Sequence, residues 1–204
     1  MELGYFDYYV IGINILGFIL FLINKWLLNH TPDKEIHSIL TIVSLLGGSL
    51  GVLISILIFD HEKLNSNERK EIMMSRVFVI CLSIIQIILF LILKGFIRNE
   101  LTIAFWEYFG THKILFAYLI IINIIAIIVF GVDKIAAAER KSRIRIVTLL
   151  VIAFFGGSIG SLIAMYAFRH KIKKDYFVIG IPLILLMQIV ILFYCMNGTL
   201  FSIG

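Results

Sequence analysis

Cysteine is scarce in this sequence, and so are the residue patterns of a familiar catalytic centre. Only two of the 204 residues are cysteines, Cys81 and Cys195, and both fall within long apolar stretches. Two such residues form neither a disulfide framework nor a metal site, so we interpret them as small apolar side chains. The sequence also lacks a nucleophile–base set, a phosphate-binding loop and zinc-ligand spacing. We therefore expect no cofactor, and the sequence favours a protein that is not an enzyme.

A signal peptide is a further feature that the sequence does not show. Residues 1–9 carry Glu2 and Asp7 in place of a basic leader, and no small-residue cleavage site follows the first apolar stretch. We expect that stretch to be retained as a membrane span.

Apolar residues are what the sequence has in excess. They make up 61% of the chain, and the mean hydropathy is +1.04, whereas globular proteins contain roughly 45–50% apolar residues. The composition therefore predicts an integral membrane protein. The formal net charge of +5 does not indicate nucleic-acid binding, because the basic residues are spread over every loop without an interleaved aromatic patch. We expect the partners to be the lipid bilayer and its anionic headgroups, which meet basic residues at span ends.

Six apolar segments are long enough, or nearly so, to cross a hydrocarbon core of about 30 Å. They are Tyr8–Leu28, His37–Phe59, Arg76–Leu93, Lys113–Val132, Ile146–Phe168 and Phe177–Met196. Between the third and the fourth lies Leu101–Gly110, whose aromatic content predicts a short helix in the headgroup region.

An internal repeat is the strongest pattern in the chain. Residues Tyr9–His61 align without gaps to Tyr118–His170 at a constant offset of 109, and about a third of the positions are identical. The matches include polar residues that similarity between apolar stretches does not explain: Asn14 with Asn123, Lys25 with Lys134, His61 with His170, and a Gly-Gly-Ser triplet in each copy. A shorter offset pairs Gln86 with Gln188. We interpret the chain as two copies of one membrane unit.

The Gly-Gly-Ser-x-Gly motif lies in the middle of the second segment of each copy. Small residues within a membrane helix allow two backbones to approach closely. The motif therefore predicts either a helix-crossing point or a break in the helix, at Gly47, Gly48 and Gly51 and at Gly156, Gly157 and Gly160.

The fold we predict is all-α, with six transmembrane helices arranged as two inverted three-helix repeats. Residues 1–98 form the first, diverged repeat, residues 99–112 an interfacial connector, and residues 113–204 the second repeat. Because three spans are an odd number, the second repeat would enter the membrane upside down, as in many transporters. The 18 Lys and Arg residues then divide nine and nine between the two sides, so the positive-inside rule gives no orientation. A monomer and a homodimer both remain open.

The second half resembles a known family in a set of spaced polar residues. The residues that carry the resemblance are Tyr118, Asn123, Asp133, Lys134, Arg143, Gly156-Gly157-Ser158-x-Gly160, Arg169-His170-Lys171, Lys174 and Phe177. This pattern is similar to the small bacterial membrane family called domain of unknown function 1294, whose usual members carry one such unit. The resemblance covers about 80 residues here and, more weakly, most of the first half. It implies a multi-pass protein of the bacterial cytoplasmic membrane and brings no established activity.

Two departures from the family pattern stand out. Ile144-Arg145-Ile146 follows Arg143, where members usually have Ile-Pro-Glu. The first half has Asn24 at the position of Asp133, and Asp60 and Glu62 flank His61 where Arg169 and Lys171 flank His170. A role that needs the full motif must therefore depend on the second half.

The inverted arrangement predicts two polar poles, because the first span of one repeat would end beside the second span of the other. One pole contains Asp60, His61, Glu62, Asp133, Lys134 and Arg143, and the other contains Asn24, Lys25, Arg169, His170 and Lys171. The first is either a gate, with Asp60, His61, Glu62 and Asp133 as weak candidate metal ligands or acid–base groups, or a salt-bridged rim. The second is either an anion site or an ordinary basic collar.

Uncharged polar residues occupy the predicted membrane depth, where we expect no acid or base and hence no proton relay. They include Asn14, Asn123, Gln86, Gln188, Ser49, Ser158 and Ser161. They either line a path for a small solute or hydrogen-bond between helices.

Three functions follow from these patterns. The leading one is a transporter or channel for a small solute or anion. The second is a membrane enzyme acting on a lipid or phosphorylated headgroup. It requires the second and fifth segments to be re-entrant hairpins, broken at Gly47-Gly48 and Gly156-Gly157, so that the Lys and His motifs of a unit lie on one side. The third is a structural or assembly subunit of a membrane complex.

Overall fold

Helices joined by short connections make up the computed structural model, which describes residues 4–30, 37–59, 68–97, 101–139, 142 and 144–198. Six helical segments are long and apolar enough to cross a membrane: Tyr5–Leu27, Ile39–Phe59, Arg76–Leu93, Lys113–Ala138, Ile146–Ala167 and Tyr176–Asn197. These correspond to the six predicted segments. The protein is therefore an all-helical, multi-pass membrane protein.

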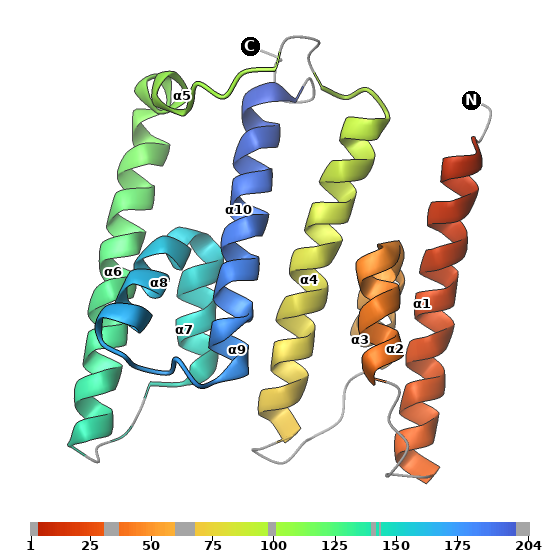
Figure 1. Ribbon diagram of the computed structural model, residues 1–204, viewed down its shortest axis with the longest axis horizontal. Coiled ribbons are helices and arrows are strands. Elements are labelled where there is room, and N and C mark those ends of the chain that lie inside the picture. The colour runs from red at the N-terminus through yellow and green to blue at the C-terminus, as the bar shows by residue number, and fades with distance from the viewer. Residues whose placement is uncertain are drawn as a thin grey trace. The chain divides into compact units, whose positions relative to one another are not determined.

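The chain divides into two compact units, Met1–Ile87 and Ile88–Gly204, which we call unit 1 and unit 2. The helices of unit 1 are α1 (Tyr5–His30), α2 (His37–Val43), the π-helical turn η1 (Ser44–Gly48), α3 (Ser49–Phe59) and most of α4 (Glu68–Leu93) (Figure 1). Those of unit 2 are α5 (Phe105–Thr111), α6 (Lys113–Ala138), α7 (Ile146–Ile152), the π-helical turn η2 (Ala153–Gly157), α8 (Ser158–Ala167), α9 (Asp175–Val178) and α10 (Gly180–Asn197).

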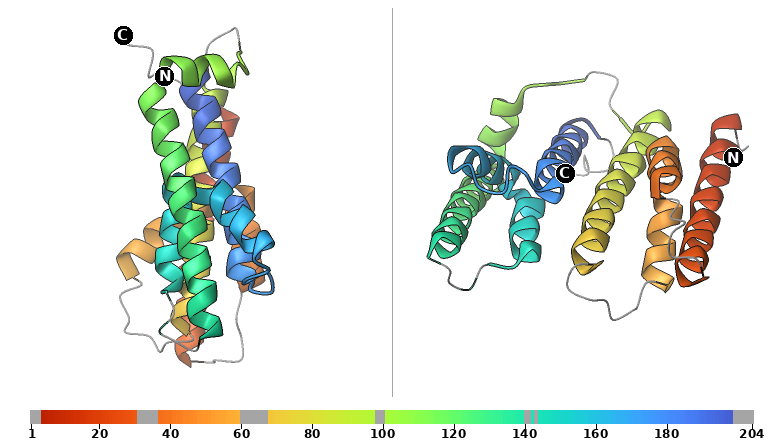
Figure 2. Two further views of the ribbon diagram at one scale, coloured as in Figure 1. Left: turned by 90° about the vertical axis from the view of Figure 1, so that its left-hand side faces the viewer. Right: turned by 60° about the horizontal axis from the view of Figure 1, so that its bottom comes forward.

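The second apolar segment of unit 2 doubles back within the membrane. The carboxylate of Asp133, near the end of α6, accepts hydrogen bonds from the backbone N–H of Ile144, before α7, and from the ring of His170, after α8. A straight helix of the 22 residues Ile146–Ala167 would separate its two ends by about 33 Å. Both ends can reach Asp133 only because the segment is a helical hairpin. Figures 1 and 2 show α7 and α8 as its two arms, beside α6.

The turn of this hairpin lies at the glycine motif. Gly156 has a φ of 118°, a left-handed conformation that glycine adopts readily, and this residue interrupts the helical backbone between α7 and α8. A Cβ added at Gly160 would lie 2.2 Å from the backbone oxygen of Asn123. The glycines thus provide both the reversal of the chain and the close packing of α8 on α6.

Unit 1 contains the same kind of hairpin. Gly47, with a φ of 122°, breaks the helix between α2 and α3. The hydroxyl of Tyr9, in the first half of α1, donates to the carbonyl oxygen of Leu46 at the turn, whereas Lys25, near the end of α1, donates to Phe59 at the end of α3. The hairpin therefore enters and leaves near the end of α1, and its turn lies at the depth of Tyr9.

The predicted inverted repeats rest on three crossings per repeat, and this premise is wrong. The second segment of each unit re-enters at the face from which it came, so each unit crosses the membrane twice. The glycine motif is a break in the helix as well as a close-packing point. The pattern of small residues is the same for a crossing and for a break, which is why the sequence left both open.

Buried apolar side chains hold each hairpin against its neighbours. In unit 1, Val52, Ile56 and Val79 form a buried cluster that joins α3 to α4. In unit 2, the fully buried rings of Phe130 and Phe177 meet edge to face, with centroids 5.7 Å apart. Outward-facing isoleucines such as those of α6 are exposed, as contact with lipid requires.

Candidate functional site

A buried carboxylate with two basic partners lies at the base of the hairpin in unit 2. Asp133 is fully buried, and its Oδ2 atom lies 2.8 Å from Nε2 of His170 and 2.6 Å from Nζ of Lys171. Its Oδ1 atom accepts the N–H of Ile144 at 2.9 Å. We call Asp133, His170 and Lys171 the Asp133 cluster. A buried carboxylate is tolerated because charge and hydrogen bonds compensate it on every side.

The backbone after α8 brings both basic residues to the carboxylate. Arg169 and Lys171 have positive φ angles of 46° and 63°, which non-glycine residues adopt at a cost of roughly 1–3 kcal/mol each. The N–H of His170 still donates to the carbonyl of Met165, so the turn continues directly from the helix. Such strain is concentrated at functional sites, where the surrounding structure imposes it.

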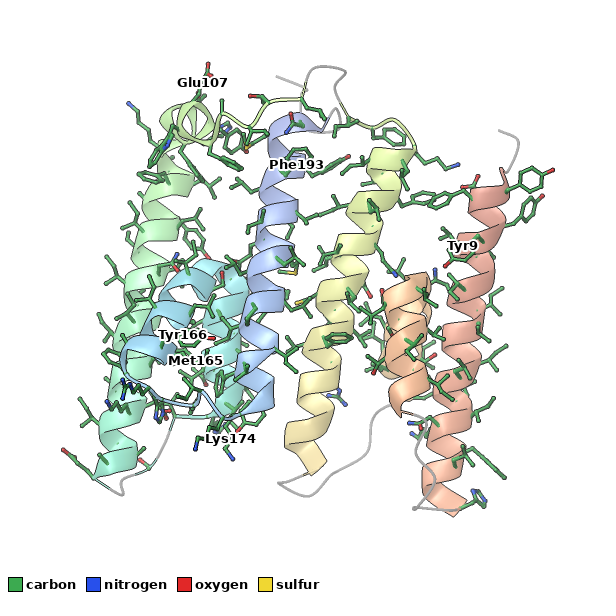
Figure 3. The ribbon with its side chains drawn as sticks, in the orientation of Figure 1. Tyr9, Glu107, Met165, Tyr166, Lys174 and Phe193 are labelled. Carbon is green, nitrogen blue, oxygen red and sulfur yellow. The ribbon has the colours of Figure 1, made fainter. Side chains whose placement is uncertain are left out.

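Basic side chains surround the cluster. Lys134, Arg169, Lys173 and Lys174 are all exposed at this end of unit 2. Lys134 lies over the ring of Phe168, with Nζ 5.8 Å from the centroid, and Nζ of Lys171 lies 4.7 Å from the centroid of Phe177. Figure 3 shows Lys174 at this end of unit 2 and Glu107 at the other. The surroundings of the cluster are therefore positive.

The structure regroups the residues of the predicted poles. Asp133 was assigned to one side of the membrane and His170 with Lys171 to the other, and their direct contact shows that this assignment is wrong. The cause is the hairpin, which returns the end of α8 to the end of α6. Helix α6 also continues to Ala138, beyond the predicted end at Val132, so Asp133 lies inside an apolar helix. Asp60, His61, Glu62 and Arg143 lie outside the described residues.

The position in unit 1 that corresponds to Asp133 is Asn24, an amide. Asn24 is buried, with 5% of its surface exposed, and Lys25 donates to the carbonyl oxygen of Phe59 at 2.5 Å. Lys25 thus closes the base of its hairpin through the backbone, whereas unit 2 uses the side chain of Asp133.

The amides predicted at membrane depth hold the hairpin turns. In unit 2, Asn123 accepts the N–H of Gly160 at 2.6 Å and donates to the carbonyl of Gly156 at 2.9 Å. Gln188 donates to the carbonyls of Ala153 and Phe154, at 2.8 and 3.0 Å, and accepts the hydroxyl of Ser158. These bonds satisfy backbone groups that the broken helix releases within the membrane, where no water replaces them.

Three of these hydrogen bonds recur in unit 1. Asn14 accepts the N–H of Gly51, and Gln86 donates to the carbonyl of Ser44 and accepts the hydroxyl of Ser49. The unit-1 residues Asn14, Ser44, Ser49 and Gly51 each lie 109 residues before the residue that makes the same bond in unit 2. Gln86 lies 102 residues before Gln188. In unit 1, the hydroxyl of Ser83 on α4 also donates to the hydroxyl of Ser49.

Sequence reasoning missed two kinds of residue. Tyr118 donates from its hydroxyl to the carbonyl of Phe155, as Tyr9 does to Leu46, and the identity of these tyrosines in the repeat was the available signal. Asn197 is fully buried and exchanges two hydrogen bonds with the backbone of Thr102, which ties the connector to the end of α10. No repeated position marked Asn197 in the sequence.

Ser161 was included among the polar residues at membrane depth. Its hydroxyl is fully buried and has no hydrogen-bond partner among the described residues. Within the described part of the chain, no three His, Cys, Asp or Glu side chains gather as a metal site would need. The weak metal candidates Asp60, His61 and Glu62 lie outside that part.

Comparison with known proteins places unit 2 in a family. The family described as "Protein of unknown function (DUF1294)" matches residues 123–177, which run from Asn123 through the glycine motif and the Asp133 cluster to Phe177. The "Uncharacterized protein YsdA" of Bacillus subtilis (strain 168) is 38% identical over 79 residues, 39% of this chain and 89% of the relative. The chain belongs to the DUF1294 family. The comparison with solved structures found no significant match.

The part of the chain that matches the DUF1294 family is the part that forms the hairpin of unit 2 and the Asp133 cluster. The matched residues include both arms of the hairpin, the amide that holds its turn and all three members of the Asp133 cluster. The relative is less than half as long as this chain, because 79 residues are 89% of it.

Proposed function

We propose that unit 2 of this membrane protein binds the phosphate of an anionic ligand, such as a lipid headgroup, at the membrane surface. The Asp133 cluster carries the proposal. Lys171 balances the charge of the carboxylate, so the surrounding arginine and lysines remain available for an anion. Arginine and lysine are the usual partners of phosphate.

The position of the cluster favours a lipid headgroup or a small phosphorylated molecule as the ligand. Both arms of the hairpin end there, at the end of a membrane-spanning helix, where headgroups meet the protein. The exposed Arg169, Lys173 and Lys174 lie on one short segment after α8. These residues would contact the phosphate, while Asp133 and Lys171 position the segment.

His170 provides an acid–base group for this site. Asp133 engages Nε2 of the imidazole, and Nδ1 is the ring nitrogen that the carboxylate does not hold. A carboxylate that orients a histidine is a common arrangement in general acid–base catalysis. We propose that any reaction on the bound headgroup uses His170 for proton transfer. This proposal corresponds to the second function predicted from the sequence, a membrane enzyme acting on a lipid or phosphorylated headgroup. That function requires re-entrant hairpins, and both units contain one.

We also propose that the chain is a tandem of two DUF1294 units in a bacterial cytoplasmic membrane. The recurrence of the turn hydrogen bonds at a constant sequence offset supports the duplication, and so does a relative of less than half this length. The bacterial source of that relative supports the location. Unit 1 has Asn24 in place of Asp133, so the proposed site belongs to unit 2.

A transport role, the leading function predicted from the sequence, is the second candidate. Helices broken at membrane depth favour it, because transporters build binding sites from such helices. The amides expected to line a path are instead bonded to the hairpin turns, which leaves the transport role without its predicted polar lining. Uptake of inorganic phosphate into proteoliposomes, above the rate of protein-free vesicles, would favour transport over binding at one face.

Lipid binding tests the proposed function. The purified full-length protein would be titrated with phosphatidylglycerol and with phosphatidylcholine, and bound lipid would be measured by native mass spectrometry. Adding inorganic phosphate to the same buffer tests whether a soluble phosphate competes for the site. We expect phosphatidylglycerol to bind at least tenfold more tightly, and Arg169→Gln with Lys174→Gln to remove most of this preference. Lys113→Gln, at the other end of α6, is the matched control and should leave it unchanged. Equal binding of both lipids, or a preference that survives the double substitution, would overturn the proposal.

A further inference from the structure

We infer that the face at which the hairpins enter lies on the cytoplasmic side of the membrane, so that the Asp133 cluster meets the anionic headgroups of the cytoplasmic leaflet. We call this side of each unit its hairpin face. In unit 2 the hairpin face holds the end of α6, both ends of the hairpin and the start of α10, and the opposite face holds α5. The inference rests on hairpin geometry and charge, and it does not depend on the proposed function.

The hairpin changes which basic residues share a side of the membrane. If the segment Ile146–Ala167 crossed the membrane, the residues after α8 would lie on the opposite side from the end of α6. The division of the Lys and Arg residues into nine and nine assumed such a crossing. The contact of Asp133 with both Ile144 and His170 instead puts the two ends of the hairpin on one side. Arg169, Lys171, Lys173 and Lys174 therefore join Lys134 and Arg145.

In unit 2 the resulting charge asymmetry is large. Six described Lys and Arg residues lie at the hairpin face: Lys134, Arg145, Arg169, Lys171, Lys173 and Lys174. Among the described residues, the opposite face has two, Lys94 after the end of α4 and Lys113 at the start of α6. All of them lie close to span ends, which is where the positive-inside rule applies. The rule places the face with the excess in the cytoplasm.

Unit 1, considered by itself, gives the same orientation. Lys25, near the end of α1, and Arg76, in the first half of α4, lie toward its hairpin face. Among the described residues of unit 1, the opposite end of α1 carries no lysine or arginine, and Lys94, which follows the opposite end of α4, is counted above with unit 2. Two hairpin units thus each place their basic end on the side where their hairpin enters.

Charge complementarity identifies the partner at this face. The cytoplasmic leaflet has a negative surface potential from its anionic lipids, and basic residues near its surface are attracted to it. The exposed segment Arg169–Lys174 has the charge and the depth to contact those headgroups. The same orientation puts α5, with Trp106 82% exposed, at the outer interface, where tryptophan is enriched.

Side-specific labelling of the full-length protein tests the orientation. Single cysteines would replace Lys174 at the hairpin face and Glu107 at the opposite face, in a Cys81→Ser, Cys195→Ser background, and react with a membrane-impermeant maleimide before and after permeabilisation of spheroplasts. Both replaced side chains are exposed. We expect Glu107→Cys to react in intact spheroplasts, and Lys174→Cys to react at least tenfold more after permeabilisation. Arg145→Cys and Lys113→Cys form a second pair, one from each face, for use if either variant fails to accumulate.

The labelling results and the lipid-binding results test different proposals. Reaction of Lys174→Cys in intact spheroplasts would overturn the inference, whether Glu107→Cys reacts there or not, and so would protection of Glu107→Cys. A protein that labels as expected but shows no preference for phosphatidylglycerol would retain its orientation and lose the proposed function. The two proposals can therefore fail independently.

Discussion

Asp133 shows how far a single position could be predicted. The sequence identifies it as a polar residue at the end of a span and as the position where the two halves differ. Its partners come from the other end of the following apolar segment, 37 and 38 residues away. No local pattern specifies that distance, because it depends on whether the intervening helix continues or reverses.

The pairing of Asp133 with Lys171 can be measured with a double-mutant cycle. Asp133→Asn removes the carboxylate that faces the partly buried ammonium of Lys171, and we expect a loss of about 3 kcal/mol in unfolding free energy. Lys171→Met alone should cost a similar amount, whereas the double variant should be closer to wild type than the sum predicts. Denaturant unfolding in detergent gives the energies. Strictly additive losses would contradict the pairing.

At the scale of elements, the re-entrant hairpin is the feature that the sequence left undecided. The spacing of the glycines, the amides and the serine predicted the turn residues, and both amides lie where the turn needs them. Six apolar segments were recognisable because length and hydropathy are local properties. Reversal at Gly47 and Gly156 depends on long-range bonds from other helices, and composition alone cannot distinguish it from a crossing.

Glycine-to-alanine substitutions test the packing of the hairpins. A Cβ at Gly51 would lie 1.8 Å from the backbone oxygen of Asn14, and one at Gly160 would lie 2.2 Å from that of Asn123. Neither backbone can move without shifting a helix, so we expect each substitution to cost about 3 kcal/mol or to prevent accumulation of folded protein.

The controls for this experiment come from the same chain. A Cβ at Gly12 or at Gly110 meets nothing within 4 Å. Gly12→Ala and Gly110→Ala should therefore leave the melting temperature unchanged or raise it slightly, since alanine favours helix. Equal effects at all four positions would show that the close approach of α3 to α1 and of α8 to α6 is unimportant.

At the scale of the whole molecule, the chain consists of two units that share corresponding turn hydrogen bonds and have different hairpin bases. The sequence repeat predicted the correspondence residue by residue, and the structure shows those residues in matching contacts. Its predicted consequence, inversion, failed because it depended on the number of crossings per unit. Two crossings return the chain of a unit to the side from which it started, whereas inversion needs an odd number.

Independence of the units is the prediction at this scale. Unit 2 is compact by itself and holds its turn with its own amides, and a family relative is about one unit long. Residues 101–204 expressed alone should therefore insert in the membrane and unfold cooperatively in detergent, as followed by circular dichroism. A fragment that accumulates only when residues 1–100 are co-expressed would show that the units depend on each other.

The distance across the hairpin of unit 2 tests the account most directly. Spin labels at Arg145 and Arg169, in the Cys81→Ser, Cys195→Ser background, flank the 22-residue segment Ile146–Ala167, and double electron–electron resonance would measure their separation. Labels at Lys113 and Glu139, at opposite ends of the 26-residue α6, calibrate the measurement at about 39 Å. A re-entrant hairpin predicts a separation below about 25 Å across the segment, allowing for the length of the labels, whereas a crossing helix predicts about 33 Å or more. The longer distance would contradict the hairpin, the Asp133 cluster and the orientation together.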